Sequence, residues 1–402
     1  MKILHTSDWH IGQVFYNYDR SDEHRHFFEW LAGIVREHTP DVMVVCGDIF
    51  HTAAPSISAQ KLYIESLVKI HEAAPEMTVV VTAGNHDSGS RIEVDRLLWE
   101  NFNVRTIGNV ERMEENLSRH IVPIGDPVVG YVVAIPHCYP LNFPVFGNDM
   151  PSEDRQVAFF RKILEKIKDT NTGGLPVVLT AHSTVIGSNP GKQELTVGGI
   201  DSIDIGKIGD GFDYMALGHI HFPQDIGNNA RYCGSAIPVS FNENYDHSVT
   251  LVEIESAGGP VRKTVIKAPQ KREMVTIPSA AVEFDEALAM LEAFPDERDS
   301  YIRLNVKTKQ YGGADWAERA IAATENKKCR YCCLLMENEH GQDHNQRRGF
   351  SQEEFRKVSP MDIAMLYWQE NRQGEMDQEL AELMELAIAE ATKTNQDDKI
   401  TQ

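Results

Sequence analysis

Asp8 and His10 stand two positions apart, just after an apolar run that begins at Ile3 and Leu4. In an extended chain, residues at i and i+2 point to the same side, so this carboxylate and this imidazole can reach one metal ion together. A polar strand end that binds nothing would show the same pair. The pair therefore indicates a metal site only if other parts of the chain supply further ligands.

Four more apolar runs end in residues of the same kinds. The runs occupy residues 42–46, 78–82, 176–180 and 214–217 and have the composition of buried strands. The polar residues that follow them are candidate metal ligands or acid–base groups: Asp48, Asn85, His86, Asp87, His182, His219 and His221. Without a ligand, so many imidazoles at strand ends would all need other hydrogen-bond partners.

Helices are predicted between these strands. Residues 21–38 carry apolar side chains at three- and four-residue spacing, and a second helix is expected at about 58–73. Alternation of strand and helix predicts parallel pairing, and such sheets bind ligands at the carboxyl ends of their strands. Residues 227–267 alternate like antiparallel strands and are expected to complete a second sheet. The predicted fold class is α/β, with two packed mixed β-sheets flanked by helices.

The candidate ligands combine imidazole, carboxylate and carboxamide oxygen. This mixture suits a pair of first-row transition ions, such as manganese, iron or zinc, better than calcium. Asp48 is the natural bridge between two ions about 4 Å apart. A water held by such a pair loses a proton near neutral pH and can attack phosphorus. The sequence thus predicts hydrolysis of a phosphate ester without a serine or cysteine nucleophile.

A smaller α/β unit is predicted after the core. Pro269 begins a linker, and the pattern beyond it is strand, helix, strand, helix, strand up to about residue 336. Cys329, Cys332 and Cys333 are not interpreted as a zinc site, because no second cysteine pair or histidine pair accompanies them.

A helical tail is predicted at the end of the sequence. Ser359 is placed as an N-cap, and residues 380–391 carry an apolar stripe on an otherwise acidic helix. The stripe fits either packing on its own domain or docking of a partner. The predicted domains are residues 1–268, 269–345 and 346–402.

The composition is that of a soluble globular protein with an acidic balance. Against 39 Lys and Arg stand 60 Asp and Glu, a net charge of −21, which argues against wrapping bare nucleic acid by charge alone. Bound cations and a basic partner could supply positive charge locally. No apolar stretch approaches the roughly 20 residues that span a bilayer, and no signal-peptide pattern precedes the first strand. The expected location is the cytoplasm, away from membranes.

The motifs resemble those of the calcineurin-like metallophosphoesterase superfamily. The residues that carry the resemblance are Asp8-x-His10, Gly47-Asp48, Gly84-Asn85-His86-Asp87, His182 and Gly218-His219-x-His221. More narrowly, residues 5–12 and 47–50 are similar to the SbcD family, the bacterial relatives of the eukaryotic double-strand-break repair nuclease. The order of core, small α/β unit and helical tail is also similar, so the resemblance covers nearly the whole chain.

The resemblance implies a role for each candidate residue. One ion would be held by Asp8, His10, Asp48 and His221, and the other by Asp48, Asn85, His182 and His219. His86 would meet the scissile phosphate or protonate the leaving oxygen, with Asp87 setting its orientation. His51 would be a second histidine in contact with the substrate. Two divalent ions are expected, Mn2+ before Mg2+, Fe2+ or Zn2+.

The function that the resemblance implies is that of a DNA nuclease subunit acting on ends or hairpins, with 3′–5′ exonuclease and single-strand endonuclease activity. Such subunits are homodimers bound to an SbcC-type ATPase and act at the nucleoid. The tail helices would grip the coiled coil of the ATPase, and the small unit would cap the site beside the DNA. Two other functions stay open: a phosphodiesterase or phosphatase for small substrates, and a non-catalytic assembly subunit.

Overall fold

The computed structural model describes residues 1–139, 142–145, 155–191, 202–308, 315–338 and 383–384. The chain divides into two compact units, Met1–Glu339 and His340–Gln402. Within the described residues, every helix and strand whose bounds are given below belongs to the first unit.

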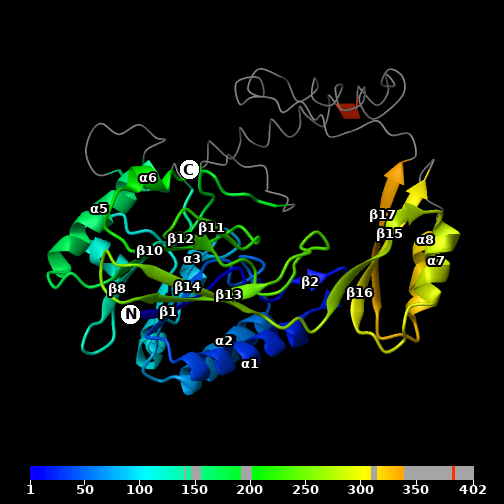
Figure 1. Ribbon diagram of the computed structural model, residues 1–402, viewed down its shortest axis with the longest axis horizontal. Helices are drawn as coiled ribbons and strands as arrows, with labels where there is room; N and C mark the ends of the chain where they lie inside the picture. Colours follow the sequence, from blue (N-terminus) through cyan, green and yellow to red (C-terminus); the bar gives the residue numbers. More distant parts are fainter. Residues whose placement is uncertain (140–141, 146–154, 192–201, 309–314, 339–382, 385–402) are drawn as a thin grey trace. The chain divides into compact units, whose positions relative to one another are not determined.

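A six-stranded sheet forms the first half of the core (Figure 1). Its strands are β1 (Lys2–Thr6), β4 (Val42–Cys46), β5 (Thr78–Thr82), β6 (Val104–Ile107), β13 (Ser248–Ile254) and β14 (Val261–Lys267). Their order in space is β14-β13-β1-β4-β5-β6. β1, β4, β5 and β6 pair in parallel. Helices α1 (Ser21–His38) and α2 (Ile57–Ala73) make the crossovers between the first three of them.

A second six-stranded sheet forms the other half of the core. Its strands are β7 (Ile121–Ile124), β8 (Gly130–Ala134), β9 (Val177–His182), β10 (Tyr214–Gly218), β11 (Gln224–Ile226) and β12 (Ala230–Tyr232). Their order is β11-β12-β10-β9-β8-β7, with parallel pairing from β8 through β9 and β10 to β12. Helix α5 (Arg155–Thr170) connects β8 to β9.

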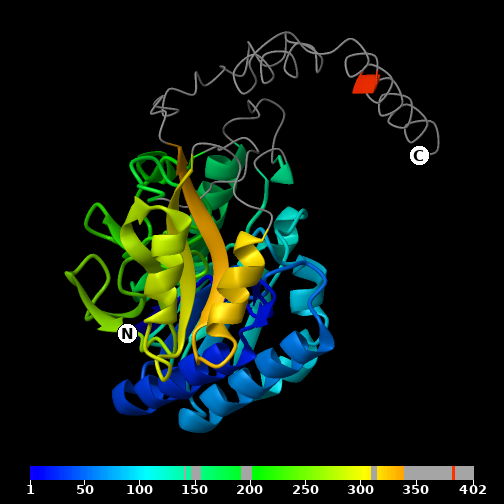
Figure 2. The same ribbon diagram turned by 90° about the vertical axis from the view of Figure 1, so that its right-hand side faces the viewer.

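The two sheets pack face to face, with helices outside. Val44 and Val80 of the first sheet and Val132 and Val178 of the second lie in one buried cluster between the sheets. α1 and α2 run side by side on the outer face of the first sheet, at the base of Figures 1 and 2. α5 packs against the outer face of the second sheet. The predicted architecture of two packed mixed sheets flanked by helices is confirmed.

The strands within residues 227–267 are divided between the two sheets. β13 pairs antiparallel with β1, placing Lys2 opposite Glu253, so the β13–β14 hairpin extends the first sheet. β12 extends the second sheet, as expected. The expectation that this whole stretch completes the second sheet is therefore wrong for β13 and β14. Alternation of apolar and polar residues predicts a strand but does not say which sheet edge it meets.

A three-stranded parallel sheet follows the core along the chain. It consists of β15 (Glu273–Val282), β16 (Ser300–Thr308) and β17 (Arg330–Asn338). Helices α7 (Phe284–Glu292) and α8 (Trp316–Thr324) cover one face of it, as Figure 2 shows. These elements follow the predicted alternation of strand and helix. The domain boundaries after residues 268 and 345 stay predictions.

Buried charges join this third sheet to the start of α1. Glu23, 3% exposed, accepts hydrogen bonds from Arg20 Nε at 3.0 Å and from the Tyr301 hydroxyl at 2.6 Å. Arg272 donates to the Asp22 carboxylate at 2.7 Å. Arg20, Glu23 and Arg272 are buried, whereas the Asp22 side chain is 41% exposed. Removing one of the three buried residues leaves an uncompensated buried charge, which costs about 3–5 kcal/mol. The joint formed by Arg20, Asp22, Glu23, Arg272 and Tyr301 therefore holds the third sheet against the core.

Short elements complete the described fold. They are β2 (Val14–Phe15), β3 (Tyr18–Asp19), α3 (Gly89–Glu93), α4 (Arg96–Trp99), α6 (Ile205–Ile208) and the 3₁₀ helices η1 (Glu100–Phe102) and η2 (Glu114–His120). The predicted tail helices lie outside the described residues, except for Leu383 and Met384, which are helical. Among the residues that can be described, no helix is long and apolar enough to cross a membrane.

Candidate metal centre

Five strand ends converge at one edge of the packed sheets. They carry Asp8 and His10 after β1, Asp48 after β4, Asn85 and His86 after β5, His182 at the end of β9, and His219 and His221 after β10. The first three strands belong to the first sheet and the last two to the second. The structure thus brings the predicted ligands together from both sheets.

Four of these residues have a left-handed backbone. Their φ angles are 51° for Asp8, 48° for His10, 50° for Asp48 and 97° for His219. A residue other than glycine holds this conformation at a cost of about 1–3 kcal/mol, and only where its surroundings enforce it. The loops enforce it on each other, because the Asp8 amide donates to the Gly47 carbonyl and the His10 amide to the Asp48 carbonyl, both at 3.0 Å.

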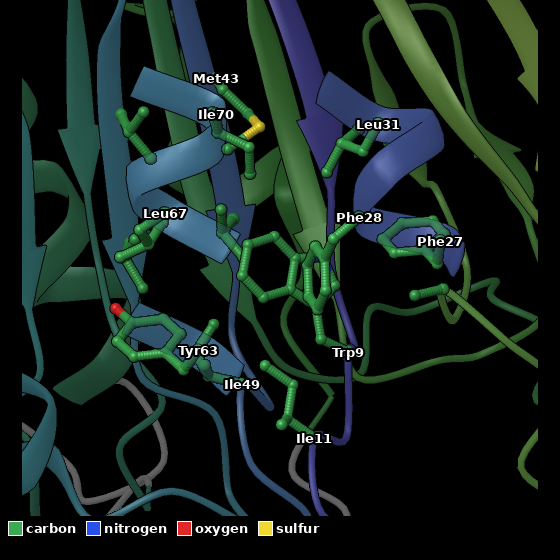
Figure 3. Close-up of a cluster of buried hydrophobic side chains, with 14 of the residues drawn as sticks. Trp9, Ile11, Phe27, Phe28, Leu31, Met43, Ile49, Tyr63, Leu67 and Ile70 are labelled. Atoms are coloured by element: carbon green, nitrogen blue, oxygen red, sulfur yellow. The ribbon is translucent and has the colours of Figure 1, made fainter. Parts of the chain in front are cut away.

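Trp9 anchors the turn between Asp8 and His10. Its fully buried indole packs edge-on against Phe28 of α1 (Figure 3). The ring centroids are 4.8 Å apart. Nε1 of Trp9 donates to the Thr6 hydroxyl at 2.9 Å. His24 Nε2, also from α1, donates to the Trp9 carbonyl at 2.8 Å. The core beneath the turn therefore fixes the two ligands on either side of Trp9.

Glycines let the strand ends approach one another. At Gly84 a Cβ would collide with the side chain and amide of Asp48. At Gly218 a Cβ would collide with the Cys46 carbonyl oxygen and with His182. Residues without a Cβ are needed at such close approaches of backbone. The end of β10 can therefore reach the end of β4 across the two sheets.

A first group of ligand atoms gathers around His10. Asp8, His10 and His221 each offer one atom within 4.8 Å of the others. His10 Nε2 lies 3.1 Å from His221 Nε2 and 3.7 Å from Asp48 Oδ2. Two imidazole nitrogens that face each other beside a carboxylate suit a shared cation.

A second group gathers around Asn85. Its Oδ1 lies 2.9 Å from His219 Nδ1 and 3.0 Å from His182 Nε2. Asp48 Oδ2 is 3.4 Å from the same His182 nitrogen. One oxygen of Asp48 therefore lies beside both groups, which is where a bridging carboxylate would have to be.

The protonation preferences of the buried groups also suit a cation. Burial holds the pKa of His10 well below its ordinary value and lowers that of His219 to about 3, so both rings are neutral, as ligands must be. Burial would raise the pKa of Asp48, but His182 and His10 outweigh it and hold the pKa well below the usual range. Burial would lower the pKa of His182, but Asp48 outweighs it in return and raises that pKa to about 9. The site thus favours positive charge beside Asp48, and metal binding there would release a proton.

His86 and His51 lie together beside the first group. Their rings stack with centroids 5.7 Å apart, and both rings lie within 5.6 Å of the His10 ring. His86 Nδ1 lies 2.9 Å from the His51 carbonyl oxygen. A carbonyl can only accept, so Nδ1 carries a proton and the chemistry of the ring is left to Nε2.

Asp87 contacts the backbone rather than the ring of His86. Its carboxylate accepts hydrogen bonds from the amides of Gly84 at 2.8 Å, Ile49 at 3.0 Å and Phe50 at 2.9 Å. The contact that orients the His86 ring is the one with the His51 carbonyl. Asp87 therefore joins the loop after β4 to the loop after β5, and its effect on His86 is exerted through the backbone.

Glu243 is a residue of this site that the sequence did not indicate. Its Oε1 lies 2.9 Å from Nδ1 of His221, 22 positions earlier in the chain. Burial raises the pKa of Glu243, but the hydrogen bond and charge of His221 outweigh burial and lower it. No spacing pattern connects Glu243 to the ligand motifs, so only the fold reveals the contact.

Short clusters of basic residues in the sequence include Arg262-Lys263, Lys271-Arg272, Lys327-Lys328 with Arg330, and Arg347-Arg348. In the described clusters, the basic side chains form ion pairs with acidic neighbours. Lys263 contacts Asp225 at 2.6 Å and Arg330 contacts Asp299 at 2.7 Å. Lys327 pairs with Asp296 and Lys328 with Glu297, both at 2.5 Å. Arg347 and Arg348 lie outside the described residues. In the described clusters, the structure therefore favours basic surface residues that are neutralised by acidic neighbours. It does not favour basic residues that are free to contact phosphate.

Comparison with known proteins identifies relatives for most of the chain. The profile of the calcineurin-like phosphoesterases matches residues 1–223. The SbcD subunit of nuclease SbcCD from Rhodobacter capsulatus is 31% identical over 314 residues, which cover 74% of this chain and 77% of that protein. The protein of the same name from Escherichia coli K12 is 31% identical over 283 residues, covering 65% and 69%. That of Bacillus subtilis is 29% identical over 262 residues, covering 63% and 66%.

Among solved structures, a β-glucosidase from Exiguobacterium marinum aligns over 82% of this chain and 88% of its own, with 10% identity and a TM-score of 0.21. A score this low says nothing about the fold. The family profile and the sequence relatives, together with the two-sheet core, agree with one another. The chain belongs to the calcineurin-like phosphoesterases and, within them, to the SbcD family of nuclease subunits.

Proposed function

We propose that this protein is the nuclease subunit of an SbcC–SbcD-type complex and hydrolyses DNA phosphodiester bonds with two divalent metal ions. The observation that carries the proposal is the position of Asp48 Oδ2, which lies 3.7 Å from His10 Nε2 and 3.4 Å from His182 Nε2. Two groups of ligands that share one carboxylate are the arrangement that two-metal hydrolysis requires. The sequence relatives bear the name of a nuclease subunit, which supports DNA as the substrate.

The two ions would be held by separate sets with Asp48 in common. The first set is Asp8, His10, Asp48 and His221, and the second is Asp48, Asn85, His182 and His219. Mn2+ is the proposed ion, because nitrogen and oxygen ligands in this proportion suit a first-row transition metal. When bound, the ions would supply an activated water as nucleophile and would stabilise charge on the phosphate oxygens.

His86 is proposed as the general acid. Its Nδ1 proton is donated to the His51 carbonyl, so the protonated ring can give up the proton on Nε2 to the leaving oxygen. His51 is proposed to contact the substrate through its side chain, which stacks on His86. Asp87 holds the loop that carries His86 through the amides of Gly84, Ile49 and Phe50.

The acidic charge of the chain supports action within a complex. With a net charge of −21 and its described basic clusters paired, the protein has little surface to attract phosphate by itself. The ions and a partner ATPase would supply that attraction. We propose that the ATPase binds the helical tail after Val358. The third sheet and its helices would form the cap beside the DNA. The protein would act at the nucleoid, in the cytoplasm.

A comparison of substrates tests the proposed function. The 402-residue chain, stripped of metal, reloaded with Mn2+ and combined with an SbcC-type ATPase and ATP, is given linear duplex DNA, a DNA hairpin and bis-nitrophenyl phosphate side by side. We expect cleavage of all three with Mn2+ and none with chelator. Hydrolysis of bis-nitrophenyl phosphate alone would indicate an enzyme for small substrates, and failure on all three would indicate an assembly subunit.

The polarity of cleavage is read from the same reactions. Duplexes labelled at one end should lose nucleotides from the 3′ side, and hairpins should be opened in the single-stranded loop. Products that shorten from the 5′ side would contradict the proposed 3′–5′ exonuclease.

A truncation tests the partner contact. A chain that ends at Val358 should still hydrolyse bis-nitrophenyl phosphate but should fail to co-purify with the SbcC-type ATPase, whereas the full chain co-purifies. Retention of the ATPase by the truncated chain would contradict docking through the tail.

A further inference from the structure

Glu243 lies in the loop between β12 and β13 and is buried against a proposed metal ligand. Its side chain is 5% exposed and that of His221 is 9% exposed. Oε1 of Glu243 lies 2.9 Å from Nδ1 of His221. The carboxylate is thus withdrawn from solvent and meets the edge of the ring opposite to the one that faces His10.

The other oxygen of Glu243 is held by the protein. Oε2 accepts a hydrogen bond from the Val239 amide at 3.0 Å and one from the Ser235 hydroxyl at 3.2 Å. His247 Nε2 lies 3.8 Å away. With both oxygens engaged, the carboxylate cannot rotate freely, so the direction in which it faces His221 is fixed.

The loop that carries Glu243 is itself tied down from two sides. From the core, Gln13 Nε2 donates to the Val239 carbonyl at 3.2 Å. From the third sheet, Arg303 donates to Asn242 Oδ1 at 3.2 Å and places its guanidinium 5.0 Å from the centre of the Phe241 ring. Glu243 follows directly after these two residues, so its position depends on both parts of the fold.

The contact decides which nitrogen of His221 can bind a metal. A histidine that binds a metal must be neutral, and an ionised carboxylate only accepts hydrogen bonds, so in the metal-binding form of His221 the proton is on Nδ1. Nε2 then presents its lone pair, and this atom lies 3.1 Å from His10 Nε2 in the first ligand group. A carboxylate behind a metal-binding histidine commonly fixes the ring in this way and makes it a stronger ligand.

We propose that Glu243 is a positioning residue that fixes the tautomer and orientation of His221 for the ion of the Asp8, His10 and His221 group. This rests on the proposed function, since that function assigns the ion. Glu243 itself would touch neither metal nor substrate.

The substitution Glu243→Gln tests the proposal. A glutamine has one oxygen where the carboxylate has two, so it cannot accept from His221 and from Val239 on opposite sides at once. We expect affinity for one of two Mn2+ ions to fall about 10- to 100-fold, and affinity for the other to stay within about twofold. Titration calorimetry with Mn2+ measures both affinities without any assay of activity.

Asp213→Asn is the matched control. The Asp213 carboxylate also holds backbone amides, accepting from Val177 at 2.8 Å and from Gly258 at 2.5 Å, but it precedes β10 at the end remote from the ligands. If the effect of Glu243 were merely structural, both variants would lose thermal stability and neither would change its affinity for Mn2+. We expect a selective loss of one ion in Glu243→Gln alone.

Electron paramagnetic resonance of bound Mn2+ gives a second readout. Wild type with two equivalents should show the spectrum of a coupled pair. Glu243→Gln should show the six-line spectrum of isolated ions, and excess Mn2+ should restore the pair. An Mn2+ affinity and a spectrum equal to wild type would overturn the proposal, whereas a wild type that binds no pair would overturn the proposed function instead.

Ser235→Ala keeps the test decisive if Glu243→Gln does not fold. It removes one donor to Oε2 and leaves the carboxylate of Glu243 in place. We therefore expect affinity for the same Mn2+ ion to fall about two- to fivefold, a smaller loss than in Glu243→Gln. No loss in Ser235→Ala, or an equal loss in Asp213→Asn, would overturn the proposal.

Discussion

His10 Nε2 and His221 Nε2 lie 3.1 Å apart, although 211 positions separate the two residues in the chain. His10 follows a strand of the first sheet and His221 a strand of the second, so the distance measures how closely the two sheet edges meet. The glycine at position 218 makes this approach possible, because a Cβ there would strike the Cys46 carbonyl. The site is therefore a property of the sheet pair and not of either sheet alone.

Asp48→Ala should remove both metal ions. The variant loses the one carboxylate oxygen that lies beside both groups, at 3.7 Å from His10 and 3.4 Å from His182. We expect kcat on bis-nitrophenyl phosphate to fall by at least about a thousandfold, since the ions contribute several kcal/mol of charge stabilisation. Calorimetry with Mn2+ and steady-state kinetics measure the two effects.

Asp246→Ala is the control for Asp48→Ala, because Asp246 is 67% exposed and pairs with Lys267. It should leave both ions and the rate unchanged. Full activity in Asp48→Ala would contradict the role of Asp48 as a bridge.

His86→Ser should keep the metals and lose turnover. The ring of His86 contacts the His51 carbonyl and lies beside His10, but its Nε2 is proposed to serve the substrate. Loss of a general acid lowers kcat by about 10²- to 10⁴-fold. Measured Mn2+ stoichiometry should stay at two. A variant that turns over at the wild-type rate would rule out the proposed role, and one that loses an ion would make His86 a ligand.

Acid should weaken the joint between the third sheet and the core. Hydrogen bonds from Arg272 hold the pKa of Asp22 below its ordinary value. Burial would raise the pKa of Glu23, but Arg20 and Tyr301 outweigh burial and lower it. A carboxylate whose pKa is lower in the folded state stabilises the fold above its unfolded pKa of about 4, and the contribution is lost as pH falls through the folded pKa. We expect Tm to decrease as pH drops below about 4.

Arg272→Met should reduce this pH dependence, because it removes a partner of both Asp22 and Glu23. Calorimetric scans from pH 7 to pH 3 measure the slopes. Arg262→Met is the control, since Arg262 is 68% exposed and its pair with Glu253 adds little stability. If all three proteins lost Tm equally between pH 5 and pH 3, the joint would not be the source.

Self-association is expected through an apolar surface beside α4. Val94, Leu97 and Leu98 are 75%, 70% and 65% exposed, which is unusual for neighbouring large apolar side chains. Light scattering should give twice the 45.3 kDa chain mass for wild type. The double substitution Leu97→Glu and Leu98→Glu should raise the dissociation constant at least about 100-fold, because buried charges without partners cost several kcal/mol.

Ile321→Glu is the control for this surface, because Ile321 is 57% exposed on α8. It should leave the dimer intact. A wild type that is monomeric would contradict the homodimer, and a double variant that still dimerises would contradict the placement of its interface on the surface beside α4.

Local patterns were sufficient for most of the core. α1 spans Ser21–His38 as predicted, because an apolar stripe at helical spacing forms wherever one face of a helix is buried. The runs at Val42–Cys46 and Thr78–Thr82 are strands buried on both faces, and their composition shows it. The types of residue after these strands also pointed to a cation, because carboxylates and imidazoles placed at strand ends are what a metal requires.

What the sequence alone determined is thus most of the core strands, the long helices between them and the chemical nature of the residues at the strand ends. Only the tertiary structure decided that β13 joins the first sheet, that Asp87 holds backbone amides and that Glu243 lies behind His221. Periodicity reports whether a face is buried, which is a local property. Which strand edge it meets and which distant side chain lies behind a ligand depend on packing between segments remote in the chain, and no spacing rule encodes that.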